Sequence, residues 1–201
     1  MAANAGGQET NTAPSRIPPR PSLVSLPPTT SRRFRPRLVT PDRKNPWTTG
    51  VPLIDLAAAA GDFGPERLLA TTAIDSEEWY AWEGAPPFAP GDFLARITGS
   101  SMEPLIPNGA WCLFRLLADG VPRGQPVLVR LVESGVEGAR YTVKDVSVEW
   151  TAAESGERVA RQIVLRPRNP AYPVMHYAGA ETAQVSIVAE LVEVVGHPAQ
   201  E

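Results

Sequence analysis

Short runs of β-branched and aliphatic residues recur from about residue 91 onward, separated by turns rich in Gly, Pro and Asn. Runs of this length with such boundaries are typical of β-strands, and their close spacing leaves little room for crossover helices. The pattern therefore predicts a mostly β, antiparallel domain over residues 91–197. The expected strands are residues 93–98, 110–116, 126–132, 140–148, 159–165, 174–177 and 185–195.

Two of these segments carry more specific expectations. Residues 185–195 alternate well enough for a strand that crosses a sheet, although their periodicity also allows a short helix. The loop at residues 133–139 is rich in Gly and charge, which is typical of a hairpin turn. We expect this turn to pair the strand before it with the strand after it.

The first 46 residues have a different composition from the rest of the chain. They hold nine of the 22 prolines and few large apolar residues, so they cannot bury enough surface to offset chain ordering. Eight Arg or Lys stand against two acidic residues, which makes this segment +6 and the remainder −9. We predict a disordered basic arm over residues 1–46, without a helix-turn-helix. Such an arm serves as a solvated linker, contacts nucleic acid non-specifically, or folds back on the acidic body.

Residues 47–90 are predicted to be a linker between the arm and the domain. They combine the apolar stretch 51–60, a Gly-rich break at residues 61–64 and the aromatic cluster of Trp79, Tyr80 and Trp82. These aromatic rings are expected in a core or an interface rather than as a platform for stacked bases.

The composition also bears on the compartment. There is no run of 18 apolar residues and no signal peptide at the N-terminus, so we expect a cytoplasmic protein that does not enter a membrane. The single cysteine, Cys112, fits that compartment and is expected to be a buried strand residue. The two histidines, His176 and His197, lack neighbours at metal-ligand spacing, so neither a metal nor a cofactor is predicted.

One serine-containing turn is a candidate for nucleophilic chemistry. Residues 98–104 read Thr-Gly-Ser-Ser-Met-Glu-Pro and directly follow a predicted strand. Gly99 permits a tight bend, and a rigid turn of this kind presents a hydroxyl together with backbone N–H groups. Taken alone, a Gly-Ser-Ser triplet is also compatible with an ordinary loop.

A single lysine stands out in the predicted domain. Of the 19 basic residues 17 are Arg, and the only lysines are Lys44 in the arm and Lys144 in the domain. Strand alternation places Lys144 on the same face as Thr142 and Val146, which would direct its amine toward an apolar interior. Burial lowers the pKa of a lysine and makes it a general base, a role that arginine cannot fill. The alternative is a surface lysine paired with an acidic neighbour.

These segments together resemble a known family. The motifs are Gly99-x-Ser101-Met102-x-Pro104, then Ile-Pro-Asn-Gly at 106–109, Arg-Gly-Gln-Pro-Val-Leu-Val at 123–129 and Tyr-Thr-Val-Lys at 141–144. Residues 165–173, Leu-Arg-Pro-Arg-Asn-Pro-Ala-Tyr-Pro, are similar to a Pro-x-Asn-x-x-Tyr-x-Pro segment. In this order they resemble the peptidase domain of LexA, the UmuD-type proteins and phage repressors. The resemblance implies the LexA/signal-peptidase-like β fold.

The same resemblance implies roles for individual residues. Ser101 is the expected nucleophile and Lys144 the base, with Ser100 a neighbour rather than the nucleophile. Backbone amides at Ser101 and an adjacent residue are expected to form the oxyanion hole, in the turn made by Gly99, Ser100 and Met102. The resemblance thus implies a serine endopeptidase with a serine-lysine dyad.

The substrate implied by the resemblance is the protein's own chain. Residues 51–64 are similar to the self-cleavage segment of the family, with Ala60–Gly61 as the bond. A small side chain followed by Gly lets a carbonyl approach a recessed serine. The alternative is a short Ala-rich helix that Gly61 ends. Cleavage there would free the basic arm.

The family also implies partners. These are a homodimer and, as a promoter of cleavage in a stress response to DNA damage, a RecA filament on single-stranded DNA. The architecture resembles UmuD more than LexA because no DNA-binding domain is expected, and signal peptidases differ by their membrane anchor. Two rival functions remain open at this stage. One is a non-catalytic dimerisation and partner-binding module of the same fold, and the other is a nucleic-acid tether formed by the arm.

Overall fold

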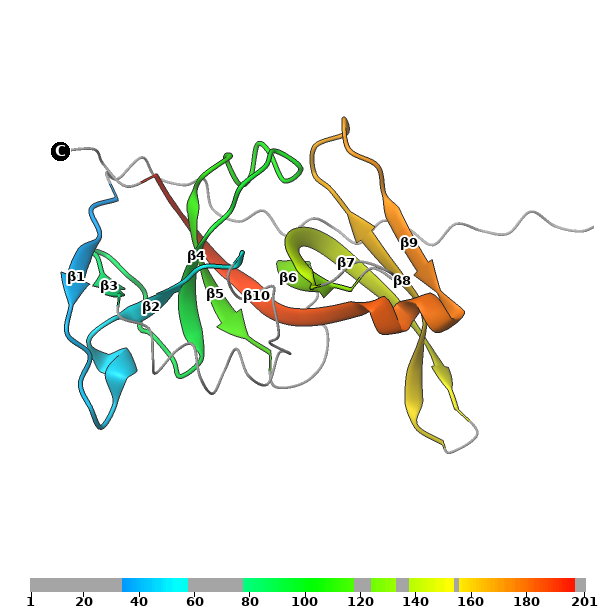
Figure 1. The fold of residues 1–201 in the computed structure, drawn as a ribbon, viewed down its shortest axis with the longest axis horizontal. Coiled ribbons are helices and arrows are strands. Elements are labelled where there is room, and N and C mark those ends of the chain that lie inside the picture. Colours follow the sequence, from blue (N-terminus) through cyan, green and yellow to red (C-terminus); the bar gives the residue numbers. More distant parts are fainter. Residues whose placement is uncertain (1–33, 58–77, 118–123, 133–137, 154–155, 198–201) are drawn as a thin grey trace, which may run out of the picture.

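A computed structural model describes residues 34–57, 78–117, 124–132, 138–153 and 156–197. Within these residues the backbone forms one ten-stranded sheet and two short 3-10 helices (Figure 1). The helices are η1 (Pro46–Thr48) and η4 (Gly179–Gln184). The strands are β1 (Arg37–Val39), β2 (Val51–Ile54), β3 (Trp79–Ala81), β4 (Asp92–Arg96), β5 (Trp111–Leu116), β6 (Pro126–Leu131), β7 (Arg140–Ala152), β8 (Arg158–Arg166), β9 (Met175–Ala178) and β10 (Val185–Gly196).

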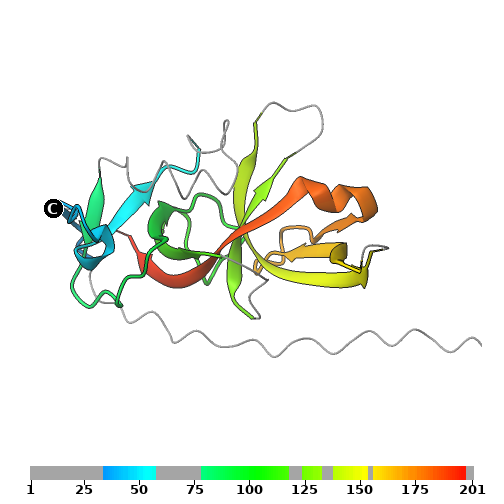
Figure 2. The ribbon, with the colours of Figure 1, turned by 90° about the horizontal axis from the view of Figure 1, so that it is seen from below.

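The strand order in the sheet is β1-β3-β2-β4-β5-β10-β6-β7-β8-β9. Neighbouring strands are antiparallel except for β2 and β4, which run parallel. The long strand β10 pairs with β5 on one side and with β6 on the other. It therefore joins the end of the molecule that carries β1–β3 to the end that carries β7–β9 (Figure 2).

The mostly β prediction is confirmed, and each of the seven strands expected after residue 91 is present. The last run is a strand rather than a helix, because its backbone pairs with β5 on one side and β6 on the other while its buried residues pack into the cores. The predicted pairing around residues 133–139 is also found, with Val127 opposite Lys144. Strand β7 continues to Ala152, four residues beyond the prediction, because it forms a second hairpin with β8.

The structure differs from the expected arm over residues 34–46. Strand β1 pairs with β3, and Phe34 is only 6% exposed. The Phe34 ring lies 5.7 Å from the rings of both Trp82 and Trp111. The Phe34 ring and the pairing of β1 therefore attach residues 34–39 to the rest of the fold. The overall composition of residues 1–46 does not reveal these contacts. Residues 1–33 lie outside the described part.

The expected linker over residues 47–90 also contributes to the sheet. Strand β2 lies between β3 and β4, and both β2 and β3 come from this range. In the described part of the apolar stretch 51–60, residues 51–54 form a strand and a turn follows at residues 56–57. The expected break at 61–64 falls outside the described residues.

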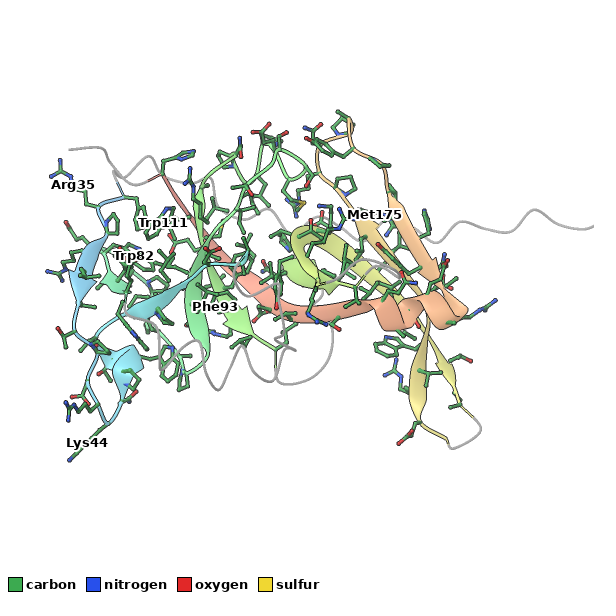
Figure 3. The ribbon with its side chains drawn as sticks, in the orientation of Figure 1. Arg35, Lys44, Trp82, Phe93, Trp111 and Met175 are labelled. Atoms are coloured by element: carbon green, nitrogen blue, oxygen red, sulfur yellow. The ribbon has the colours of Figure 1, made fainter. Side chains whose placement is uncertain are left out.

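Three hydrophobic cores lie along the sheet. The central core contains Phe93, Phe114 and Leu191, and the distal core contains Val127, Ile163 and Leu165. The third, which we call the aromatic core, contains Phe34, Val51, Trp82, Leu94, Leu113 and Val195. Two of its tryptophans, Trp82 and the half-buried Trp111, lie at the end of the molecule that carries β1 (Figure 3).

Several residue-level expectations are confirmed by burial. Trp79 is 1% exposed and Trp82 8% exposed, as predicted for core residues. Cys112 is a fully buried residue of β5, and burial raises the pKa of its thiol. No helix in the described ranges is long and apolar enough to cross a membrane.

Candidate active site

The serine turn follows β4 directly. Gly99 has a φ of +98°, a conformation that favours glycine, and its N–H donates to Asn108 Oδ1 at 2.8 Å. Three residues later Met102 buries its side chain in the central core, with 2% of its surface exposed. The turn is thus held at both ends, with Ser100 and Ser101 between them.

Lys144 reaches this turn from β7. Its side chain is 4% exposed, and its Nζ lies 2.8 Å from Ser101 Oγ, 2.7 Å from Thr142 Oγ1 and 2.9 Å from the Val143 carbonyl oxygen. A neutral amine has two N–H groups and one lone pair. If the N–H groups donate to Thr142 and Val143, the lone pair faces the Ser101 hydroxyl.

The surroundings of Lys144 favour this neutral form. Burial, and to a smaller extent the positive charge of Arg140, lowers the pKa of Lys144 from 10.5 to about 8. Desolvation has this sign because an ammonium loses more hydration than an amine. At pH 7 roughly one lysine in ten is then neutral, compared with far fewer than one in a thousand for an exposed lysine.

The segment after β8 clamps the backbone of the serine turn. The N–H groups of Arg168 and Asn169 both donate to the Ser101 carbonyl oxygen at 3.1 Å. The Asn169 side chain adds a bond from Nδ2 to the Ser100 carbonyl oxygen at 3.0 Å. Two consecutive carbonyls of the turn are therefore fixed by one short stretch of chain.

This clamp also fixes where the amides of the turn point. In a planar trans peptide the C=O and the following N–H point in opposite directions. Because the Ser100 carbonyl points toward Asn169, the Ser101 N–H points away from it. Because the Ser101 carbonyl points toward Arg168 and Asn169, the Met102 N–H also points away from this segment. Neither amide donates to a backbone carbonyl within the described ranges. Preorganised amides of this kind can receive an oxyanion.

Side chains connect the clamp to the strand that carries Lys144. Arg168 Nε donates to Asp145 Oδ2 at 2.9 Å and Arg168 Nη2 to Asp145 Oδ1 at 3.2 Å. The hydroxyls of Ser100 and Tyr172 lie 2.7 Å apart. Asp145, which follows Lys144, and Ser100, which precedes Ser101, therefore both contact residues 168–172 after β8.

A cavity of about 810 Å³ opens beside Ser101, and its lining includes Arg140 to Val143, the residues that precede Lys144 on β7. Its floor includes Met102, Leu128 and Val143, and it also contacts Thr142 and Ser101. The chain that leaves β2 lines it through Asp55, Leu56 and Ala57, and the chain that re-enters at Glu78 lines it too. The cleft is therefore bordered by the segment that immediately precedes the expected cleavage bond.

The structure brings together five of the seven site residues predicted from the sequence: Gly99, Ser100, Ser101, Met102 and Lys144. The other two, Ala60 and Gly61, lie outside the described residues.

Sequence reasoning assigned no role to Thr142 or Asn169, although the two motifs that contain them were noted. The alternation of β7 placed Thr142 on the face of Lys144, which was a usable signal. No local pattern could place Asn169 against a turn 69 residues earlier.

No group of three His, Cys, Asp or Glu side chains that could hold a metal ion occurs among the described residues. His176 Nδ1 lies 3.5 Å from Gln162 Nε2, on the β8–β9 pair rather than at the cleft.

The comparison with known families gives one match. A family model described as Peptidase S24-like matches residues 52–192, which is most of the chain and includes the serine turn, β7 and the clamp. No curated protein matches the chain.

Proposed function

Because the chain belongs to the Peptidase S24-like family, we propose that it is a serine endopeptidase with Ser101 as nucleophile and Lys144 as general base. The observation that carries this proposal is the 2.8 Å separation between Lys144 Nζ and Ser101 Oγ, with the amine buried and its other contacts made to neutral oxygens. A nucleophile and a base within hydrogen-bond reach are the minimum for covalent catalysis.

The chemistry follows from this geometry. Neutral Lys144 takes the hydroxyl proton as Ser101 Oγ forms a bond to the substrate carbonyl carbon, and the carbonyl oxygen becomes an oxyanion near the Ser101 amide. The C–N bond then breaks, and the leaving amine receives the proton from Lys144. A water molecule, deprotonated by the same lysine, attacks the acyl ester and releases the acid and Ser101.

We propose the protein's own Ala60–Gly61 bond as the substrate. In the parallel pair β2–β4 each residue faces the one 41 positions later, as Leu53 faces Leu94 and Ile54 faces Ala95. Ala60 and Ser101 are separated by the same 41 positions. Asp55 to Ala57 already line the cleft with Ser101, so a chain that continues in this direction at about 3.3 Å per residue reaches the nucleophile within a few residues.

The test is cleavage of the purified full-length chain at neutral and alkaline pH, followed by intact-mass measurement under denaturing conditions. We expect two fragments that join at Ala60–Gly61. Ser101→Ala and Lys144→Ala should remove both. Matched controls are Ser100→Ala, which loses only the hydroxyl contact with Tyr172, and Lys44→Ala outside the site. A Ser101→Ala chain that still yields a fragment beginning at Gly61 would contradict the mechanism.

We further propose that the cut acts as a regulatory switch, as the family resemblance suggests. The corresponding promoter is a RecA filament on single-stranded DNA, and the corresponding assembly is a homodimer. Adding such a filament to the full-length chain should accelerate formation of the two fragments. If neither alkaline pH nor the filament yields fragments, the rival function, a non-catalytic partner-binding module, becomes the better account.

A further inference from the structure

We propose that the N-terminal fragment stays bound to the rest of the protein after the chain is cut between residues 58 and 77, so that cleavage produces a two-chain complex. The proposal rests on the proposed function for the cut itself. Retention depends only on residues 34–57 and their contacts, so we expect it for a cut at any bond between residues 58 and 77.

The backbone argument begins with the strand order β1-β3-β2-β4. The fragment before the cut contributes β1 and β2, whereas β3 and β4 follow the cut. Strand β3 therefore lies between two strands of the other fragment, pairing Leu38 with Tyr80 on one side and Val51 with Tyr80 on the other. Strand β2 in turn lies between β3 and β4. Removing the fragment would leave both β3 and β4 without these ladder partners.

Side chains of the fragment are also part of the cores. Val51 is fully buried and Phe34 is 6% exposed in the aromatic core, and Ile54 is 4% exposed in the central core. Phe34 contacts the rings of Trp82 and Trp111, both of which follow the cut. Dissociation would expose these apolar surfaces to water, which opposes it.

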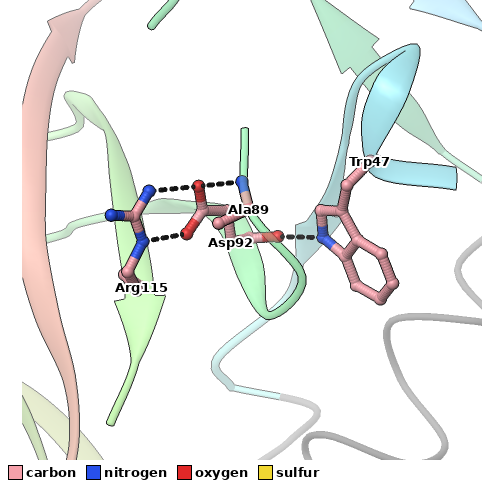
Figure 4. A network of polar contacts seen from close by, with 4 residues as sticks. All are labelled: Trp47, Ala89, Asp92 and Arg115. Carbon is pink, nitrogen blue, oxygen red and sulfur yellow. Dashed lines mark hydrogen bonds and ion pairs between the residues drawn. The ribbon is translucent and has the colours of Figure 1, made fainter. Parts of the chain in front are cut away.

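A polar contact anchors the fragment at a third place. Trp47 Nε1 donates to the Asp92 backbone oxygen at 2.9 Å (Figure 4). The Trp47 ring also lies 5.7 Å from the ring of Trp79. Asp92 is itself fully buried. Its carboxylate accepts two hydrogen bonds from Arg115 and one from the Ala89 N–H, which compensate for its burial. The anchor point is therefore a rigid part of the other fragment.

Retention changes what cleavage does. The basic residues 1–33 would remain attached, in contrast to the expectation that the cut frees the arm. Asp55 to Ala57 belong to the retained fragment and line the cleft beside Ser101. The product end therefore stays at the nucleophile, and each molecule performs one turnover. What the cut alters is the continuity of the chain between β2 and β3.

The experiment compares the fully cleaved chain under native and denaturing conditions. Native mass spectrometry and size-exclusion chromatography should show one species with the mass of the intact 21.6 kDa chain plus one water. Denaturing mass spectrometry of the same sample should show two fragments. Separate native peaks for the two fragments would overturn the proposal.

A second preparation separates this proposal from the proposed function. In the Ser101→Ala chain, residues 66–71 are replaced by the recognition sequence of a site-specific protease, which then makes the cut. Retention is tested in this nicked chain whether or not the wild-type protein cuts itself. If the wild-type chain stays whole but the nicked chain keeps its fragment, the proposed function fails and retention stands. If the nicked chain separates, retention fails whatever the wild type does.

Matched substitutions in the nicked chain locate the attachment. Trp47→Ala removes the bond to Asp92 and the contact with Trp79, and should speed fragment dissociation about tenfold or more, since interface changes act mainly on the dissociation rate. Leu38→Ala changes a side chain that is 65% exposed and should leave that rate unchanged. Equal dissociation rates for the two variants would count against the attachment described here. Before nicking, both variants should show the circular dichroism spectrum of the parent chain.

Discussion

Lys144 places an ionisable amine inside a β-sheet, with neutral oxygens as the acceptors of its hydrogen bonds. The arrangement serves a base because it disfavours the ammonium. The same feature works against stability at neutral pH, since most lysines are still protonated there and the charge stays buried. Activity and stability should therefore respond to this residue in opposite ways.

The pH dependence of cleavage follows from the lowered pKa of Lys144. The neutral amine is the active base, so the rate should rise about tenfold per pH unit below pH 8 and level off above about pH 9. Initial rates from intact-mass measurements between pH 6 and 10 check this. Lys144→Arg should be inactive throughout, because a guanidinium stays protonated. A flat wild-type profile would exclude a lysine base.

Removing the Lys144 amine should raise stability, although it abolishes activity. The pKa of Lys144 is lower in the folded than in the unfolded chain, so the unfolded chain binds more protons between pH 8 and 10.5, and stability grows as pH rises through that window. Lys144→Met should therefore raise the free energy of unfolding at pH 7 by about 1 to 3 kcal/mol, after allowance for lost hydrogen bonds.

The advantage of Lys144→Met over the wild type should shrink as the pH approaches 10.5. Urea denaturation of both chains at pH 7 and pH 10 measures it. Thr142→Val, which removes one acceptor but leaves the amine buried, is the matched control and should not be stabilising. A Lys144→Met chain less stable than the wild type at pH 7 would show that the amine is not buried as a charge.

At the scale of an element, the clamp formed by Arg168 and Asn169 and the serine turn act as a unit. The turn is short, yet three hydrogen bonds from this segment hold its two central carbonyls. The same segment is tied to β7 through Asp145. The orientation of the Ser101 amide thus depends on residues that do not contact Lys144.

Asn169→Ala should slow cleavage by about 10- to 100-fold, less than the roughly 100- to 1,000-fold loss on removal of an oxyanion donor, because the Ser101 amide remains but is held less firmly. The pH at which the rate levels off should not change, because Asn169 contacts the turn and not the amine. Tyr172→Phe is the control: it removes the hydroxyl contact with Ser100 and should change the rate less than about threefold. Equal rates for wild type and Asn169→Ala would show that the amide needs no such support.

The elements differ in how far the sequence could predict them. Strands after residue 91 are mostly five residues or longer and pair mostly with neighbours in the chain, so their local apolar runs and turn residues were sufficient. Strand β1 has three residues, and β2 contains Pro52 and pairs with strands that follow it by 25 residues or more. Both exist because distant partners cover them. Likewise, Ser101 and Lys144 could be named individually, but only the fold brings them to 2.8 Å.

At the scale of the whole molecule, the folded body includes residues 34–46, which composition assigns to an arm. The composition of residues 1–46 is basic and rich in proline, and it does not reveal the few residues that attach residues 34–46 to the fold. Phe34, Trp47 and Val51 bury apolar surface against rings and strands that follow them by 30 residues or more in the chain. The molecule therefore needs residues that composition alone would assign to an arm.

Truncation should reveal this boundary. Removal of residues 1–33 should leave the melting temperature within about 2 °C of the full-length value, since no described core residue is lost. Removal of residues 1–50 deletes Phe34 and Trp47, each expected to contribute about 3 kcal/mol or more, and should lower the melting temperature by about 10 °C or more. Thermal unfolding followed by circular dichroism measures both. Equal melting temperatures for the two truncations would place the boundary after residue 50.

The two ends of the segment 58–77 have a consequence for protein engineering. The chain departs beside Ala57 and returns beside Glu78, and both residues line the same cleft. The distance between Ala57 and Glu78 is therefore set by the fold and does not depend on the number of residues that connect them. Doubling the length of a flexible loop costs only about 0.6 kcal/mol. A peptide tag or a small foreign domain inserted between residues 64 and 77 should therefore cost the fold little stability.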